Sequence, residues 1–108
     1  MRGQPDLHPD TVAMIAPYSL THVIPARAIL AEETRLAAVL LAAGIDPVGL
    51  RLDQPAIDCK LRDLDEEATA RNITVVSRGW ITTLDGDVEV VLGFEREADA
   101  VVMKLALG

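Results

Sequence analysis

The sequence predicts an α+β fold, in which a mainly antiparallel sheet of four to five strands carries two to three helices on one face. Three observations indicate this class. Several short runs alternate apolar and polar residues, as half-buried strands do. Longer runs space their apolar residues three and four apart, as packed helices do. The expected order of elements matches the split β-α-β order of ferredoxin-like folds, with a C-terminal hairpin arm and a helix added.

The chain length corresponds to a single domain. With 108 residues the chain has room for one hydrophobic core. We assign residues 1–9 to a flexible arm and residues 10–108 to one α+β domain. Half of the residues are apolar, but the aromatic ones are only Tyr18, Trp80 and Phe94. The core is therefore expected to consist mainly of aliphatic side chains.

The first expected elements are a short helix and a strand. Asp10 can cap a helix over residues 11–16, because its side chain can accept hydrogen bonds from the unpaired amides of the first turn. Pro17 ends that helix, since the residue before a proline avoids helical backbone angles. Residues 18–24 alternate weakly between apolar and polar side chains, which predicts a strand.

The strongest helical pattern runs from Pro25 to Ala43. Pro25 suits the first position of a helix, where a missing amide hydrogen is harmless, and Gly44 suits the position just after the end. Ile45 could then pack back on the last turn, as in a Schellman ending. We expect the core face to consist of Ile29, Leu36 and Leu40. We expect solvent to cover Arg27, Glu32, Glu33, Thr34 and Arg35.

Two alternating runs predict a first β-hairpin. Residues 48–52 place an apolar side chain at every second position, and so do residues 57–61, where Cys59 is one of the apolar positions. The short connection over residues 53–56 would join the two strands. Cys59 would then point into the core as a small, inert apolar side chain.

A short helix is expected over residues 63–71. Asp63 and Glu66 have the spacing of a capping box, and acidic residues in the first turn favour the helix dipole. Asn72 is expected to end the helix in a left-handed conformation. The helix start holds the densest acidic cluster of the chain, which consists of Asp63, Asp65, Glu66 and Glu67.

A second hairpin is predicted around Asp85-Gly86, because this pair between strand-forming residues favours a two-residue type I′ turn. Counting outward from the turn pairs Thr83 with Val88 and Trp80 with Val91. The buried face would consist of Ile81, Val88, Val90, Leu92 and Phe94. Trp80 would lie on the opposite face.

A final helix is expected over residues 96–107, with the packed face Ala98, Val101, Val102 and Leu105. The segment from Gly93 to Gly108 resembles the C-terminal tails of small uncharacterised proteins from tailed bacteriophages. The matching residues are Phe94, Asp99, Ala100, Lys104 and Leu105. This resemblance implies a viral origin and transfers no activity.

A second resemblance concerns residues 36–52, which read LAAVLLAAGIDPVGLRL. They are similar to the helix–glycine–isoleucine–strand passage of small regulatory ligand-binding modules of the ACT type. The resemblance implies a ferredoxin-like fold and the binding of a small molecule.

The charge balance excludes some partners and favours others. The chain has 10 basic and 17 acidic residues, a net charge of −7, and no run of Lys or Arg. Nucleic acids and anionic membranes are therefore not expected as partners. The longest apolar stretch, residues 36–43, is far shorter than the about 20 residues of a membrane span. A single cysteine and an N-terminus without an apolar signal region predict a cytoplasmic protein, in the host cytoplasm if the chain is viral.

No motif for catalysis, a cofactor or a metal is present. His8, His22 and Cys59 are too far apart in the sequence to form a ligand pair, and there is no phosphate-binding glycine motif. Trp80 beside Arg78 has the composition of an interface anchor. The alternative, that a helix or the N-terminal segment covers Trp80, stays open.

These observations leave two hypotheses. The first is a small acidic, non-enzymatic protein that acts through protein–protein contacts, as a phage or structural component, as an inhibitor of a host protein, or as a homo-oligomer. Its predicted contact residues are Trp80, Arg78, Asp63, Asp65, Glu66 and Glu67, which suit a basic partner. The second is a small-molecule-binding regulatory module of the ACT or ferredoxin-like type.

Overall fold

The computed structural model describes residues 7–108, which form four helices and one three-stranded antiparallel sheet. The elements are α1 (Pro9–Ile15), β1 (Tyr18–Ile24), α2 (Ala26–Ala42), α3 (Asp53–Ala70), β2 (Ser77–Thr82), β3 (Val88–Phe94) and α4 (Glu97–Leu107). The prediction of four to five strands with two to three helices is therefore wrong, and the ferredoxin-like order is not found. The expected strand over residues 18–24 is confirmed as β1.

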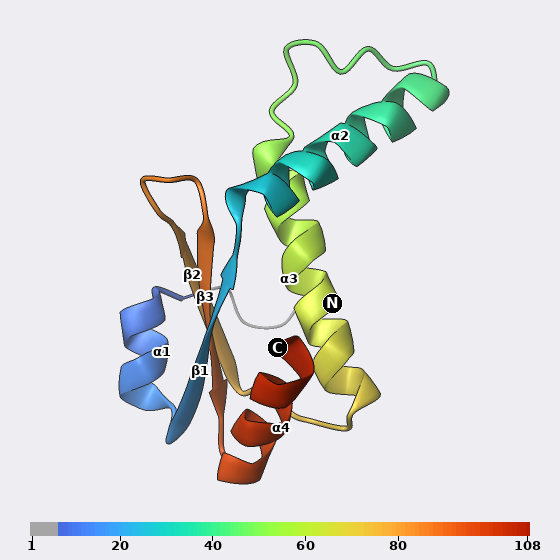
Figure 1. Ribbon diagram of the computed structural model, residues 1–108. Helices are drawn as coiled ribbons and strands as arrows, with labels where there is room; N and C mark the ends of the chain where they lie inside the picture. The colour runs from blue at the N-terminus through green and yellow to red at the C-terminus, as the bar shows by residue number, and fades with distance from the viewer. Residues whose placement is uncertain (1–6) are drawn as a thin grey trace.

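The sheet has the order β1-β3-β2 and carries helices on both faces. Figure 1 shows α1 on one face and α3 and α4 on the other, whereas α2 leaves the body after β1. The α3 and α4 side holds the main core, in which the β3 residues Val88, Val90, Leu92 and Phe94 are fully buried. The expectation that all helices share one face is therefore wrong.

The predicted first hairpin is wrong, because residues 57–61 lie inside the long helix α3 and residues 48–52 form no strand. The buried positions Ile57, Leu61, Leu64 and Ala68 are four, three and four residues apart, which is helical spacing. Within the alternating run, Ile57 and Leu61 are four residues apart and therefore also share one face of a helix, while Cys59 lies on another side. The expected short helix over residues 63–71 is the second half of α3.

Both predicted helix stops are confirmed. Gly44 has a φ of 81°, and the Ile45 amide donates to the Leu40 carbonyl at 2.8 Å. Asn72 has a φ of 57°, and the amide of Ile73 donates to the Ala68 carbonyl at 2.9 Å. Each is the six-to-one hydrogen bond of a Schellman motif, which satisfies a carbonyl of the last turn.

The second hairpin is present, but its register differs by one residue from the prediction. The Gly86 amide donates to the Thr83 carbonyl and the Thr83 amide to the Asp87 carbonyl, so the loop has three residues, with Gly86 at a φ of 87°. Trp80 consequently pairs with Val90 instead of Val91, and residue 81 pairs with Glu89. Because paired residues share a face, Trp80 lies on the main core side, and the predicted face for Ile81 is wrong.

The last helix turns a different face to the core from the predicted one. Met103 is fully buried, and Ala100 and Leu107 pack beside it. The residues predicted to pack, Ala98, Val101, Val102 and Leu105, are exposed instead. Since α4 has apolar side chains on most of its circumference, spacing alone does not select the buried stripe.

The N-terminal helix begins two residues earlier than expected. His8 is the residue that caps it, since its Nδ1 accepts a hydrogen bond from the amide of Asp10 at 3.1 Å. Leu7 pairs with Gly79 in a parallel bridge. Residues 1–6 of the predicted flexible arm lie outside the described part of the chain.

Candidate functional site

The predicted contact residues on α3 are spread around the helix. The Asp65 carboxylate accepts a 2.6 Å hydrogen bond from Arg78 Nη1, and the Glu67 carboxylate accepts one of 2.6 Å from Arg71. Asp63 and Glu66 instead line a hollow next to α2. The structure therefore brings Arg78 and Asp65 together, and it separates them from the other acidic residues.

Trp80 lies at the margin of the core. It is partly buried and packs against the core cluster of the α3 and α4 side. Its backbone amide donates to the Leu7 carbonyl at 3.1 Å. The second interpretation of Trp80, as a covered side chain, agrees with this placement, whereas its role as an interface anchor stays a prediction.

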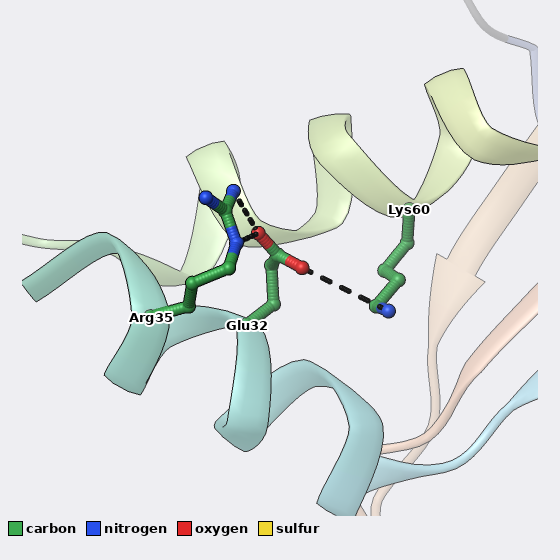
Figure 2. Close-up of polar contacts among 3 residues, drawn as sticks. All are labelled: Glu32, Arg35 and Lys60. Atoms are coloured by element: carbon green, nitrogen blue, oxygen red, sulfur yellow. Dashed lines mark hydrogen bonds and ion pairs between the residues drawn. The ribbon is translucent and has the colours of Figure 1, made fainter. Parts of the chain in front are cut away.

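A buried carboxylate lies where α2 crosses α3. Glu32 was expected in solvent but is only 9% exposed. Figure 2 shows its side chain between Arg35 of the same helix and Lys60 of α3. Arg35 Nε donates to Glu32 Oε2 at 2.7 Å, Arg35 Nη2 donates to the same oxygen, and Lys60 Nζ lies 3.8 Å from Oε1.

The electrostatics of this cluster keep Glu32 ionised. The hydrogen bond from Arg35 lowers the pKa of Glu32 below its usual value, against the opposing effect of burial, and the Lys60 charge lowers it further. Both carboxylate oxygens face a cation. A carboxylate so held is poorly suited to take or give a proton near neutral pH, and well suited to join two helices.

The hollow beside this cluster has a volume of about 280 Å³ and is open to solvent. It is lined by Glu32, Arg35, Cys59, Arg62, Asp63 and Glu66. Three of these side chains are acidic and two are basic, so the charge of the lining selects neither an anion nor a cation. Among residues 7–108, no group of three His, Cys, Asp or Glu side chains is placed to hold a metal ion.

The burial of Glu32 could have been predicted from the spacing of residues in the sequence. Glu32 lies three residues after Ile29 and four before Leu36, so it occupies a position within the predicted core stripe. The opposite charge of Arg35, three residues on, is a further signal. The contribution of Lys60 could not be found, because the residues around it were assigned to a strand.

The second half of α2 projects from the body together with the loop that follows, as Figure 1 shows. We call residues 37–50 the α2 extension. Ala28, Ile29 and Leu36 are the α2 residues that belong to the core or pack against it in the described chain, and the extension contributes none. The radius of gyration is 15.1 Å, above the about 13 Å of a compact chain of this size.

The α2 extension exposes large apolar side chains. Val39, Leu41, Ile45, Val48 and Leu50 have exposed fractions between 48% and 84%. Residues 37–45 contain no charged side chain. A helix that is apolar on all sides is normally buried, so this surface is unusual for a chain in water.

Comparisons with protein-family models, with curated proteins and with solved structures found no match. No helix among residues 7–108 is both long enough and apolar enough to cross a membrane.

Proposed function

We propose that this protein works by binding another protein through the α2 extension and carries out no reaction of its own. The observation that supports the proposal is the exposed apolar surface of Val39, Leu41, Ile45, Val48 and Leu50. Covering these partly exposed side chains would contribute roughly 5 kcal/mol to binding. A partner surface is the simplest source of that cover.

The Glu32 cluster supports the same proposal, because it fixes the base of the extension. The ion pair between Glu32 and Lys60 joins α2 to α3 five residues before the extension begins, and the hydrogen bonds from Arg35 of the same helix hold the Glu32 carboxylate in place. A helix held at its base loses less conformational freedom when a partner binds, which favours affinity. The cluster then has a positioning role rather than a chemical one.

The chemistry of the partner follows from the surface. An apolar patch on the partner would face residues 37–45, and basic residues around that patch would be favoured by the net charge of −7. Such a protein would serve as a structural or accessory component, in a phage particle if the C-terminal resemblance reflects its origin, or as an inhibitor of a host protein. The ACT-type alternative depended on a strand over residues 48–52, which is not formed, and we do not propose it.

A photo-crosslinking residue at Leu41 tests the proposal in the cells that produce the chain. The matched control carries the same residue at Thr69, an exposed position on α3. We expect a discrete cross-linked product from position 41 and none from position 69. The product should disappear when Val39→Glu and Val48→Glu are added, because two charges would have to be buried in the interface.

Two outcomes would overturn the proposal. One is the absence of any product from position 41 above the control. The other is a product that persists in the Val39→Glu, Val48→Glu variant, since the apolar surface would then not be the contact.

A further inference from the structure

The outer edge of β1 is an unprotected sheet edge. β1 pairs with β3 on one side, and in Figure 1 its other side faces the viewer with no element in front of it. Within residues 7–108, the backbone bonds outside the strand ladders include none from residues 18–24. The strand has seven residues and contains no proline, glycine or charged side chain. Natural proteins usually shorten, charge or cover such an edge.

Apolar surface lies on the neighbouring helix. α4 packs against β1, and it leaves Val101, Val102 and Leu105 exposed. Tyr18 and Val23 of β1 are exposed as well. Val101 and Leu105 lie nearly opposite the buried Met103 on α4 and therefore point away from the sheet. Tyr18 and Val23, at roughly 100 Å² each, offer about 200 Å² per copy, so the contact would rest mainly on the backbone ladder and belong to the small interfaces below about 1,200 Å².

We propose that β1 pairs antiparallel with β1 of a second copy of this chain across a two-fold axis, which joins two three-stranded sheets into one of six strands. The proposal goes beyond the proposed function, because it uses a surface other than the α2 extension. The new ladder would contain about six to eight backbone hydrogen bonds.

The sequence of β1 suits a second copy. Full overlap of the seven residues places the axis at Thr21, so that Thr21 faces Thr21 of the second copy and Tyr18 faces Ile24. Threonine pairs and pairs of an aromatic with a β-branched residue are favourable across strands. This register pairs core-face residues with core-face residues, so the core side continues from one sheet to the next.

The absence of charged side chains on β1 permits a second copy as the occupant. Each chain carries a net charge of −7, and a self-contact through acidic segments would be repulsive. The strand contributes no like charges to the contact, because residues 18–24 contain none. A basic partner, in contrast, would find no acidic side chain on this strand.

Sedimentation velocity over a concentration series tests the proposal with the full chain and with Thr21→Lys and Thr21→Glu. Thr21 is exposed, so both variants should keep the wild-type unfolding curve at concentrations where every chain is a monomer. We expect the wild type to sediment as a dimer and each variant to dimerise about tenfold more weakly or worse, because like charges face each other at the axis. An equimolar mixture of the two variants should regain the dimer. Thr11→Lys and Thr11→Glu, on the exposed side of α1, are the matched controls and should dimerise as the wild type does.

A wild type that stays monomeric at every concentration would overturn the proposal. A dimer that both Thr21 variants leave unchanged would also overturn it, since the contact would then lie elsewhere. Loss of the dimer in the Val39→Glu, Val48→Glu variant alone would assign self-association to the α2 extension instead. Because the cross-link from position 41 is scored separately, the proposed function can fail or stand independently of the dimer.

Discussion

The two outer edges of the sheet differ in their backbone hydrogen bonds. At the β2 edge, the Leu7 amide donates to the Arg78 carbonyl at 2.9 Å, and the Trp80 amide donates to the Leu7 carbonyl at 3.1 Å. At the β1 edge no corresponding backbone bonds occur within residues 7–108. The difference shows that the chain closes one edge with its own backbone, whereas no backbone segment among residues 7–108 bonds to the other edge.

A glycine makes the closed edge possible. A Cβ atom on Gly79 would collide with the carbonyl oxygen of Leu7 and would lie 2.9 Å from the carbonyl carbon of His8. The backbone before α1 therefore approaches β2 at a position with no side chain. β1 contains no glycine, and no backbone hydrogen bond from residues 7–108 reaches its outer edge.

Gly79→Ala should break the closed edge and have the largest effect. The added methyl group would push away the backbone of Leu7 and His8 and cost both edge hydrogen bonds, which we expect to lower the free energy of unfolding by about 3 kcal/mol. Denaturant unfolding measures this change. Thr21→Val at the open edge is the control and should stay within about 0.5 kcal/mol of the wild type when compared at a fixed concentration. Equal effects of the two substitutions would contradict the comparison.

Leu7→Pro should have an intermediate effect, because proline has no amide hydrogen to donate to Arg78. We expect a loss of about 1–2 kcal/mol relative to Leu7→Ala, which keeps the amide and removes most of the side chain. Thermal or denaturant unfolding of the two variants gives the difference. If the two variants were equally stable, the hydrogen bond from Leu7 would not hold the edge closed.

The smallest expected effect is the change in stability with pH that His22 causes. It concerns only the open edge, because β2 has no histidine. Burial lowers the pKa of His22 below its usual value of 6.5, so the folded state binds a proton less readily than the unfolded state. The stability that this contributes is complete above pH 6.5 and is lost as the pH falls through the lowered pKa. Unfolding measured from about pH 8 to about pH 5 should show this loss. His22→Gln should remove that part of the slope, and an unchanged slope would assign it to other groups.

The sequence predicted the features that depend on local backbone chemistry. The stops at Gly44 and Asn72 need a left-handed residue, and the turn near Gly86 needs a positive φ, so residue type is a direct signal for each. The strand over residues 18–24 was also found from its alternation. Its edge position follows from the strand order, which no local pattern encodes.

The missed features depend on tertiary packing. In so short a run, the apolar pair Ile57 and Leu61 fits either a strand or one face of a helix, and the first half of α3 was assigned wrongly for that reason. One additional loop residue in the second hairpin moved Trp80 to the other face of the sheet. In α4, more than one side of the helix is apolar. The side that contains Met103 is the buried one, because it contacts β1 and β3.

The candidate site was predicted only in part. Arg78 and Asp65 were named as residues that contact a partner; the structure joins them to each other in an ion pair, and their contact with a partner stays a prediction. The α2 extension was not predicted as a surface, because its apolar run was interpreted as the end of a packed helix. Leu36 is the last α2 residue that packs against the core, and this limit is set by where α3 crosses α2.

Amide hydrogen exchange, followed residue by residue over a range of protein concentrations, tests the difference between the edges most directly. We predict that the Trp80 amide is protected at every concentration, because Leu7 of the same chain accepts its hydrogen bond. The amides of β1 that do not bond to β3 should exchange rapidly in dilute solution and gain protection as the concentration rises. The Thr21→Lys variant should lose this gain. Fast exchange of these β1 amides at all concentrations, or a Trp80 amide as fast as theirs, would contradict the account.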